Sequence, residues 1–251
     1  MPESVTGTGA VARLAALPGV RTASAVADAA EQARAAGQVL PVSPALTELL
    51  PHGGLRRGTT VAVRDSTSLL LALLAEATAR GSWAAVVGAP RLGLVAAGEL
   101  GVELGRLALV PHPGAEFAAA TAALLDGFDL VAVRLPPGSE ALARRLSARA
   151  RHRGAVLLSF GPWPGAEVEL RCRPVRWSGP ADGHGHLEAR EVVVEVTGRA
   201  ALVRPVRSTL LLPGPEGTVR TVPAVPTVPA VPTLPAVTVA PPVAVAEAGA
   251  G

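Results

Sequence analysis

Short apolar runs alternate with longer amphipathic stretches through the middle of the chain. The apolar runs lie at residues 59–63, 83–87, 107–110, 130–133 and 155–160. The stretches between them, at 66–80, 92–100, 115–125 and 139–151, have the spacing of amphipathic helices. Because strands that alternate with helices of this length form βαβ units, the pattern predicts an α/β fold, a mainly parallel sheet flanked by helices on both faces.

The pattern changes after Pro164. Residues 168–173 and 191–196 alternate apolar and polar side chains, and residues 178–187 between them have the composition of a loop. This alternation predicts an antiparallel strand pair that extends the sheet at its C-terminal side.

The N-terminal part is predicted to be helical. Residues 9–38 are rich in Ala, Arg and Glu and are interrupted at Pro18-Gly19, which indicates two short helices. Ser43 and Pro44 are typical of an N-cap and a first helical position, and they predict a third short helix that reaches Leu50.

The C-terminal part is dominated by Pro, Val and Ala from Pro213 onward. Prolines at this density cannot sustain a helix or an interior strand, so we expect polyproline-II-like disorder. The sequence therefore divides into an N-terminal helical segment (1–40), a core domain (41–207) and a disordered Pro-rich tail (208–251). The tail is either a passive end or a ligand for an aromatic groove in a partner.

Length and composition limit the class of protein. A chain of 251 residues fits one domain with tails. No apolar run is long enough to cross a membrane, and the N-terminus, which carries Glu3, lacks the regions of a secretory signal. The lone Cys172 excludes an intramolecular disulfide and fits a reducing compartment. We expect a cytoplasmic protein with no membrane partner.

The basic residues are all arginine and are unevenly spread. Residues 134–207 carry 13 Arg against 7 Asp and Glu, which suits an anionic partner. Five arginines crowd the predicted helix before the last parallel strand: Arg144, Arg145, Arg149, Arg151 and Arg153. They form either a contact surface for DNA phosphates or an acidic partner, or a solvated helix face.

Residues 59–80 have the strand–loop–helix frame that carries a phosphate-binding loop. Such a loop uses glycines to close backbone N–H groups around phosphates, a lysine, and a Ser or Thr for magnesium. Here the loop Arg64-Asp65-Ser66-Thr67-Ser68 has no glycine or lysine, and Asp65 would repel a triphosphate. The later strands run into Gly88-Ala89-Pro90 and Arg134, where magnesium chemistry needs acids. We predict no ATP hydrolysis, no cofactor and no catalytic residue.

Two other constellations carry less chemistry. Cys172, Asp182, His184 and His186 lack the paired spacing of a zinc site, so no metal is predicted. Ser66, Ser68 and Cys172 have no adjacent His–carboxylate pair to activate a nucleophile.

Three aromatic residues, Phe160, Trp163 and Trp177, fall near one end of the predicted sheet. They form either an exposed docking patch or a cover over the sheet edge.

Four segments together resemble the RecA family over residues 40–205. They are GGLRRG (53–58), VVGAPRLGLVAAGELGVELGRLALVPHP (86–113), LLDGFDLVAV (124–133) and the pair VELRCRPVRW and EAREVVVEVTGR (168–177 and 188–199). The lysine, glycines and acids of the family do not carry over at 64–68, Pro90 and Arg134. The segment Gly161–Gly165 stands where RecA has its second DNA-binding loop. With these departures, the chain looks most like the actinobacterial ImuA-prime type, a degenerate RecA-like protein.

That resemblance implies a non-catalytic accessory protein, or adaptor, in DNA-damage-induced translesion synthesis, which is mutagenic. The implied partners are an ImuB-like Y-family polymerase homologue and an error-prone replicative-type polymerase, with a low-affinity contact to single-stranded DNA. Nucleoid association after DNA damage is then expected. Two alternatives stay open: a SulA-like cell-division inhibitor and a RecA/RadA-type DNA-dependent ATPase.

Overall fold

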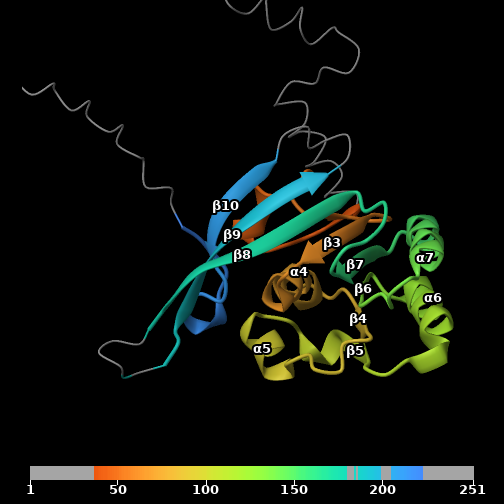
Figure 1. Ribbon diagram of the computed structural model, residues 1–251, viewed down its shortest axis with the longest axis horizontal. Helices are drawn as coiled ribbons and strands as arrows, with labels where there is room; N and C mark the ends of the chain where they lie inside the picture. The colour runs from red at the N-terminus through yellow and green to blue at the C-terminus, as the bar shows by residue number, and fades with distance from the viewer. Residues whose placement is uncertain (1–36, 180–183, 185, 199–204, 223–251) are drawn as a thin grey trace, which may run out of the picture.

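A computed structural model describes residues 37–179, 184, 186–198 and 205–222 (Figure 1). Within this part of the chain a large mixed sheet has the strand order β11-β10-β9-β8-β3-β7-β6-β4-β5. The strands are β3 (Thr60–Arg64), β4 (Ala84–Val87), β5 (Leu107–Val110), β6 (Leu130–Val133), β7 (Val156–Phe160), β8 (Val168–Ser178), β9 (Ala189–Gly198), β10 (Val206–Leu211) and β11 (Arg220–Thr221). The predicted mixed α/β architecture is confirmed.

Helices cover both faces of the parallel half. They are α4 (Thr67–Ala79), α5 (Leu94–Glu99), α6 (Phe117–Gly127) and α7 (Glu140–Arg153), with α6 and α7 side by side in Figure 1. Single 3-10 turns lie at η1 (Leu104–Arg106), η2 (Gly114–Glu116) and η3 (Pro215–Gly217). Each predicted helix between residues 66 and 151 is present, with ends within a few residues of those expected.

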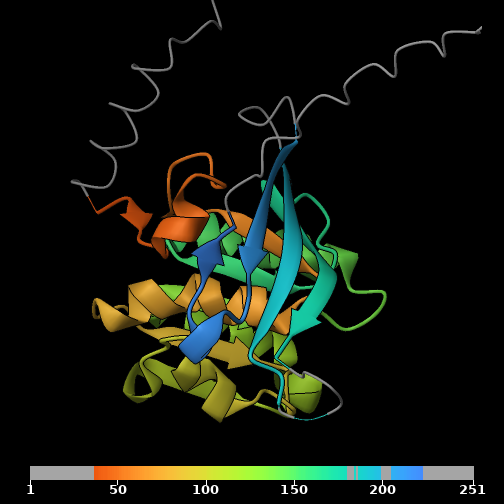
Figure 2. The ribbon, with the colours of Figure 1, turned by 90° about the vertical axis from the view of Figure 1, so that its left-hand side faces the viewer.

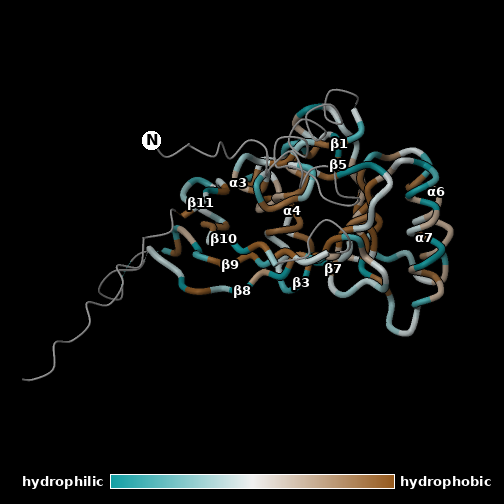
Figure 3. Tube along the Cα trace, turned by 90° about the horizontal axis from the view of Figure 1, so that it is seen from above, coloured by the Kyte–Doolittle hydropathy of each residue, from teal (hydrophilic) through white to brown (hydrophobic). Residues whose placement is uncertain are grey.

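Side chains alternate between the two faces of the sheet along each strand, and this alternation divides the hydrophobic core into two layers. In β6, Leu130 and Ala132 pack with the residues of α4, while Val131 and Val133 pack with those of α6 and α7. All four side chains are fully buried. Successive side chains of a strand point to opposite faces, so a run without polar residues needs helices on both sides. Figure 3 shows hydrophobic residues gathered along these strands.

The second half of the sheet is antiparallel and wider than predicted. β8 runs parallel to β3, with Val61 opposite Val168, and β9 returns antiparallel to β8. β10 then pairs with β9 along its whole length, and β8, β9 and β10 lie side by side in Figure 2. The predicted strand pair is therefore confirmed, and β10 and β11 extend it.

The C-terminal boundary predicted at residue 207 needs correction. Residues 208–222, which the sequence assigns to the tail, continue β10 and form β11. Leu210 and Leu212 have no exposed surface, because they cover the same core layer as Val192 and Val194 of β9. The tail from residue 223 onward lies outside the described residues.

The N-terminal boundary differs as well. Residues 1–36, and with them most of the predicted helical segment, lie outside the described part of the chain. Within that segment, β1 (Val39–Leu40) is a strand that pairs with β2 (Leu55–Arg56). Helix α3 (Pro44–Thr47) has its proline at the first position as predicted but ends before Leu50. The Ser43 hydroxyl makes no cap, since it is buried without a partner among the described residues.

Candidate functional site

In the loop after β3, a side chain of the loop itself caps the helix that follows. Asp65 has a positive φ of 65°, which turns the chain sharply from β3 into α4. Ser66 then caps α4, because its Oγ accepts the backbone N–H of Leu69 at 3.1 Å. A first-turn N–H group that a phosphate would use is thus satisfied within the chain.

The cysteine beside this loop is not an activated nucleophile. Cys172 on β8 is buried, and burial raises the pKa of its thiol, although a hydrogen bond with Ser66 and the charge of Arg190 act in the opposite direction. Only the thiolate is reactive, so burial keeps this sulfur inert. Cys172 packs with the hydrophobic core.

A cleft of about 560 Å³ opens at the carboxyl ends of the parallel strands. Its lining comes from the loop, from the segments after β4 and β6, and from the end of β7: Thr67, Gly88, Ala89, Pro90, Arg91, Leu92, Arg134 and Phe160. The Arg134 guanidinium stands 5.2 Å from the centre of the Phe160 ring. Gly88 has a positive φ of 73°, and a Cβ at this position would lie 3.3 Å from the Arg134 carbonyl oxygen. Ligands of open α/β sheets bind at this edge, so the cleft is the candidate site.

The arginines of this edge differ in their partners. Arg64 and Arg171 both approach Glu169, at 3.7 and 3.3 Å. Among the described residues, Arg91 and Arg134 form no ion pair. The cleft therefore carries two cations and no lining carboxylate.

The arginine helix predicted from the sequence is α7. Arg149 and Arg153 both bind Asp126 of α6, and the Arg149 hydrogen bond lowers the pKa of that carboxyl below its usual value. Arg151 lies 3.6 Å from Glu167.

The two remaining arginines of α7, Arg144 and Arg145, are exposed and make no ion pair within the described ranges. Contact of α7 with phosphate stays a prediction. Arg144 and Arg145 are the arginines of α7 that have no carboxylate partner in the described part of the chain.

The three aromatic residues do not form one exposed patch. Trp163 is only 4% exposed, packs in the core layer of α6 and α7, and donates its Nε1–H to Ser147 Oγ at 2.9 Å. Phe160 packs against the opposite core layer beside the cleft. Trp177, near the end of β8, is 47% exposed and stacks with Arg190 at 5.3 Å. Trp163 is a core residue, which the sequence did not show.

The residues considered as metal ligands are not brought together in the described part of the chain. In the described residues no group of three His, Cys, Asp or Glu side chains is arranged to hold a metal. Cys172 is buried and His186 is exposed, while Asp182 lies outside the described residues. None of the described helices is long and apolar enough to span a membrane.

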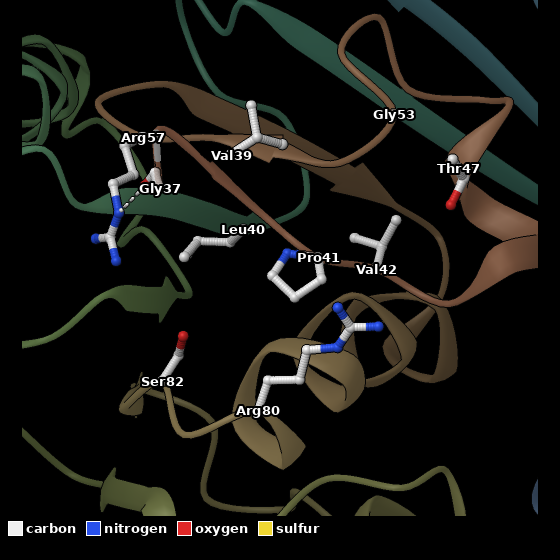
Figure 4. Close-up of a pocket in the computed structure, with 10 residues that line it drawn as sticks. All are labelled: Gly37, Val39, Leu40, Pro41, Val42, Thr47, Gly53, Arg57, Arg80 and Ser82. Atoms are coloured by element: carbon white, nitrogen blue, oxygen red, sulfur yellow. Dashed lines mark hydrogen bonds between the residues drawn. The ribbon is translucent and has the colours of Figure 1, made fainter. Parts of the chain in front are cut away.

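A second pocket, of about 440 Å³, lies at the opposite edge of the sheet (Figure 4). The two arginines that line this pocket already have partners within the protein. Arg57 donates to the Gly37 carbonyl at 3.0 Å and to Asp129 at 2.7 Å, and Arg80 is paired with Glu76. The contacts of Arg57 tie the β1–β2 ribbon to the start of β6, while the Arg80–Glu76 pair lies within α4 and its C-terminal end.

Comparison with known proteins places the chain in a family. Residues 48–165 match the MT3502 N-terminal domain family. The chain is 37% identical over 164 residues to the uncharacterized protein Rv3395c of Mycobacterium tuberculosis, an alignment that covers 61% of this chain and 80% of the relative. The matched domain contains β3 to β7 and the whole lining of the cleft. The chain therefore belongs to the same family as Rv3395c of Mycobacterium tuberculosis.

Proposed function

We propose that the protein is a non-catalytic, RecA-like accessory protein of the ImuA-prime type, which acts as an adaptor in translesion DNA synthesis after DNA damage. The observation that carries the proposal is the loop between β3 and α4. It keeps the position of a nucleotide loop at the carboxyl edge of a parallel sheet, yet its hydroxyl caps its own helix and Asp65 is exposed beside it.

The arrangement of elements supports the RecA-like part of the proposal. β3 lies between β8 and β7 near the middle of the sheet, and its carboxyl end leads through the loop into α4. β8 and β9, which pair antiparallel with each other, follow β7 in the chain, as the resemblance implies.

The chemistry of the strand ends supports the non-catalytic part. Magnesium and an attacking water need carboxylates near the phosphates. The segments after β4 and β6 instead supply Arg91 and Arg134, and no lining residue of the cleft is acidic. An adaptor role needs only a stable surface, which the two-layer core supplies.

The partners follow from the resemblance. An ImuB-like Y-family polymerase homologue is the proposed direct partner, and an error-prone replicative-type polymerase is the enzyme that the complex serves. Direct contact with single-stranded DNA is a secondary part of the proposal, through Arg144 and Arg145.

Two measurements test the proposal. Calorimetry of the full chain with magnesium-ATP is expected to show no saturable heat at millimolar nucleotide, and co-purification with the ImuB-like homologue of the same genome is expected to recover both proteins. Saturable nucleotide binding would contradict the non-catalytic role. Filamentation on expression, without any recovery of the polymerase homologue, would favour a cell-division inhibitor.

A further inference from the structure

The cleft at the carboxyl ends of β3, β4, β6 and β7 combines positive charge with apolar surface. Arg91 and Arg134 are both exposed and stand without carboxylate partners in the described part of the chain. Leu92 and Phe160 line the same cleft. Two unpaired guanidinium groups beside apolar walls are suited to a ligand that carries carboxylates between apolar side chains.

The apolar surface continues beyond the cleft onto α5. Leu94 is 42% exposed and Val95 is 76% exposed, and Gly93 alone separates them from Arg91 and Leu92 in the chain. Arginine and aromatic residues are enriched at protein–protein interfaces, and the exposed aliphatic side chains add apolar area beside them. Apolar surface is therefore offered both by the cleft lining and by α5.

We propose that this cleft and the adjoining surface of α5 are the docking site for an acidic, apolar peptide segment of a protein partner. The proposal deepens the adaptor role stated above and rests on it. Carboxylates of the segment bind Arg91 and Arg134, and its apolar side chains pack on Leu92, Leu94 and Val95.

Two other anionic ligands fit this geometry less well. A nucleotide triphosphate needs several converging N–H donors and a metal, whereas here the Ser66 hydroxyl accepts the Leu69 N–H and no residue lining the cleft is acidic. Single-stranded DNA binds by stacking successive bases on aromatic faces along a basic groove. Phe160 is the one aromatic residue that lines the cleft, and Arg134 covers a face of its ring.

Fluorescence anisotropy with the full chain tests the proposal directly. The probe is a short fluorescein-labelled peptide of alternating Glu and Leu, compared with the same peptide carrying Gln in place of Glu. We expect saturable binding of the Glu peptide, weaker by at least about tenfold for the Gln peptide, because each lost charge-assisted bond is worth roughly that factor. The double variant Arg91→Gln/Arg134→Gln is expected to lose at least about tenfold for the Glu peptide as well.

The control variant is Arg56→Gln/Arg80→Gln, which removes the same charge near the amino ends of β3 and β4, away from the cleft. It should bind the Glu peptide as the wild type does. All these arginines are exposed, so thermal melts should show that both variants fold. No saturable binding of the Glu peptide, equal binding of both peptides, or unchanged binding by the cleft variant would overturn the proposal. Tighter, cleft-dependent binding of an oligothymidylate than of the Glu peptide would overturn it too.

Co-purification with the ImuB-like homologue separates this proposal from the adaptor role. Recovery of the homologue by the wild type and by the cleft variant alike means that the adaptor role stands and the docking site is wrong. If the wild type binds the Glu peptide through the cleft but never recovers the homologue, the docking site stands and the proposed partner is wrong.

Discussion

Removing residues 208–251 should unfold the domain or destabilise it severely, whereas removing residues 223–251 should not. The first cut deletes most of β10, which pairs with β9 from Val206 to Leu211, and all of β11. It also deletes Leu210 and Leu212, which are fully buried, and uncovers Val192 and Val194. The second cut ends the chain at the last described residue, Val222.

The size of the effect follows from the two buried leucines. Burying a leucine side chain stabilises a protein by about 1.5–3 kcal/mol, so the pair contributes about 3–6 kcal/mol. A whole domain is stable by only about 5–15 kcal/mol. For a chain of this size each kcal/mol lowers the melting temperature by about 2–4 °C, which gives a fall of about 6–24 °C.

Thermal melts followed by circular dichroism measure this directly on the full chain and the two truncated chains. The variant Leu210→Ala in the full-length protein is the matched control, with an expected loss of about 2–5 kcal/mol. The chain ending at Val222 should melt within about 2 °C of the full chain, because the removed Pro-rich composition cannot build a core. If the chain ending at Arg207 melts like the full chain, β10 is not part of the folded core and the corrected boundary is refuted.

Three further predictions concern single contacts. Arg149 lowers the pKa of Asp126, so the pair stabilises the folded state above the ordinary Asp pKa and loses this effect as the pH falls through the lowered value. The stability difference in urea between wild type and Asp126→Asn should therefore shrink below about pH 4, and a difference independent of pH would contradict the pairing. Changing Arg144 and Arg145 to Gln should reduce the salt dependence of single-stranded DNA binding by up to about 0.7 in log–log slope per lost contact. Adding Arg149→Gln should leave this slope unchanged, and a further drop would mean that Arg149 leaves Asp126 for phosphate. Buried Cys172 should react with iodoacetamide only in denaturant, and rapid reaction of the native protein would contradict its burial.

The parallel half of the fold was predictable because its strands and helices have distinct periods. β6 begins and ends where its apolar run does, since a strand buried on both faces tolerates no polar residue. β10 was not predictable for the opposite reason. Its sequence VRSTLL mixes polar and apolar residues, and only Leu210 is fully buried within it. The prolines that follow then suggested that the folded chain had already ended.

The sequence placed the arginines of α7 on a helix but gave no sign of their partners. Asp126, which binds Arg149 and Arg153, lies 23 residues before Arg149, on another helix. Such a pair is visible only once α6 and α7 are packed together. The shared cleft of Arg91 and Arg134 was missed for a related reason. Arg91 stands in a loop beyond β4 and Arg134 directly after β6, and only the parallel pairing of β4 and β6 brings the two segments to one edge.

The glycines of GGLRRG, which carried much of the resemblance, have a structural role here that needs no ligand. A Cβ on Gly54 would lie 2.5 Å from the carbonyl oxygen of Leu40, which pairs with Leu55 across the β1–β2 ribbon. Gly58 has a positive φ of 76°, and a Cβ there would lie 3.3 Å from the backbone of Arg151 at the end of α7. Packing requires these glycines whether or not a nucleotide binds. The side chains of Asp65 and Arg134 are exposed, so the fold can keep the approach to the loop while the loop itself loses its phosphate chemistry.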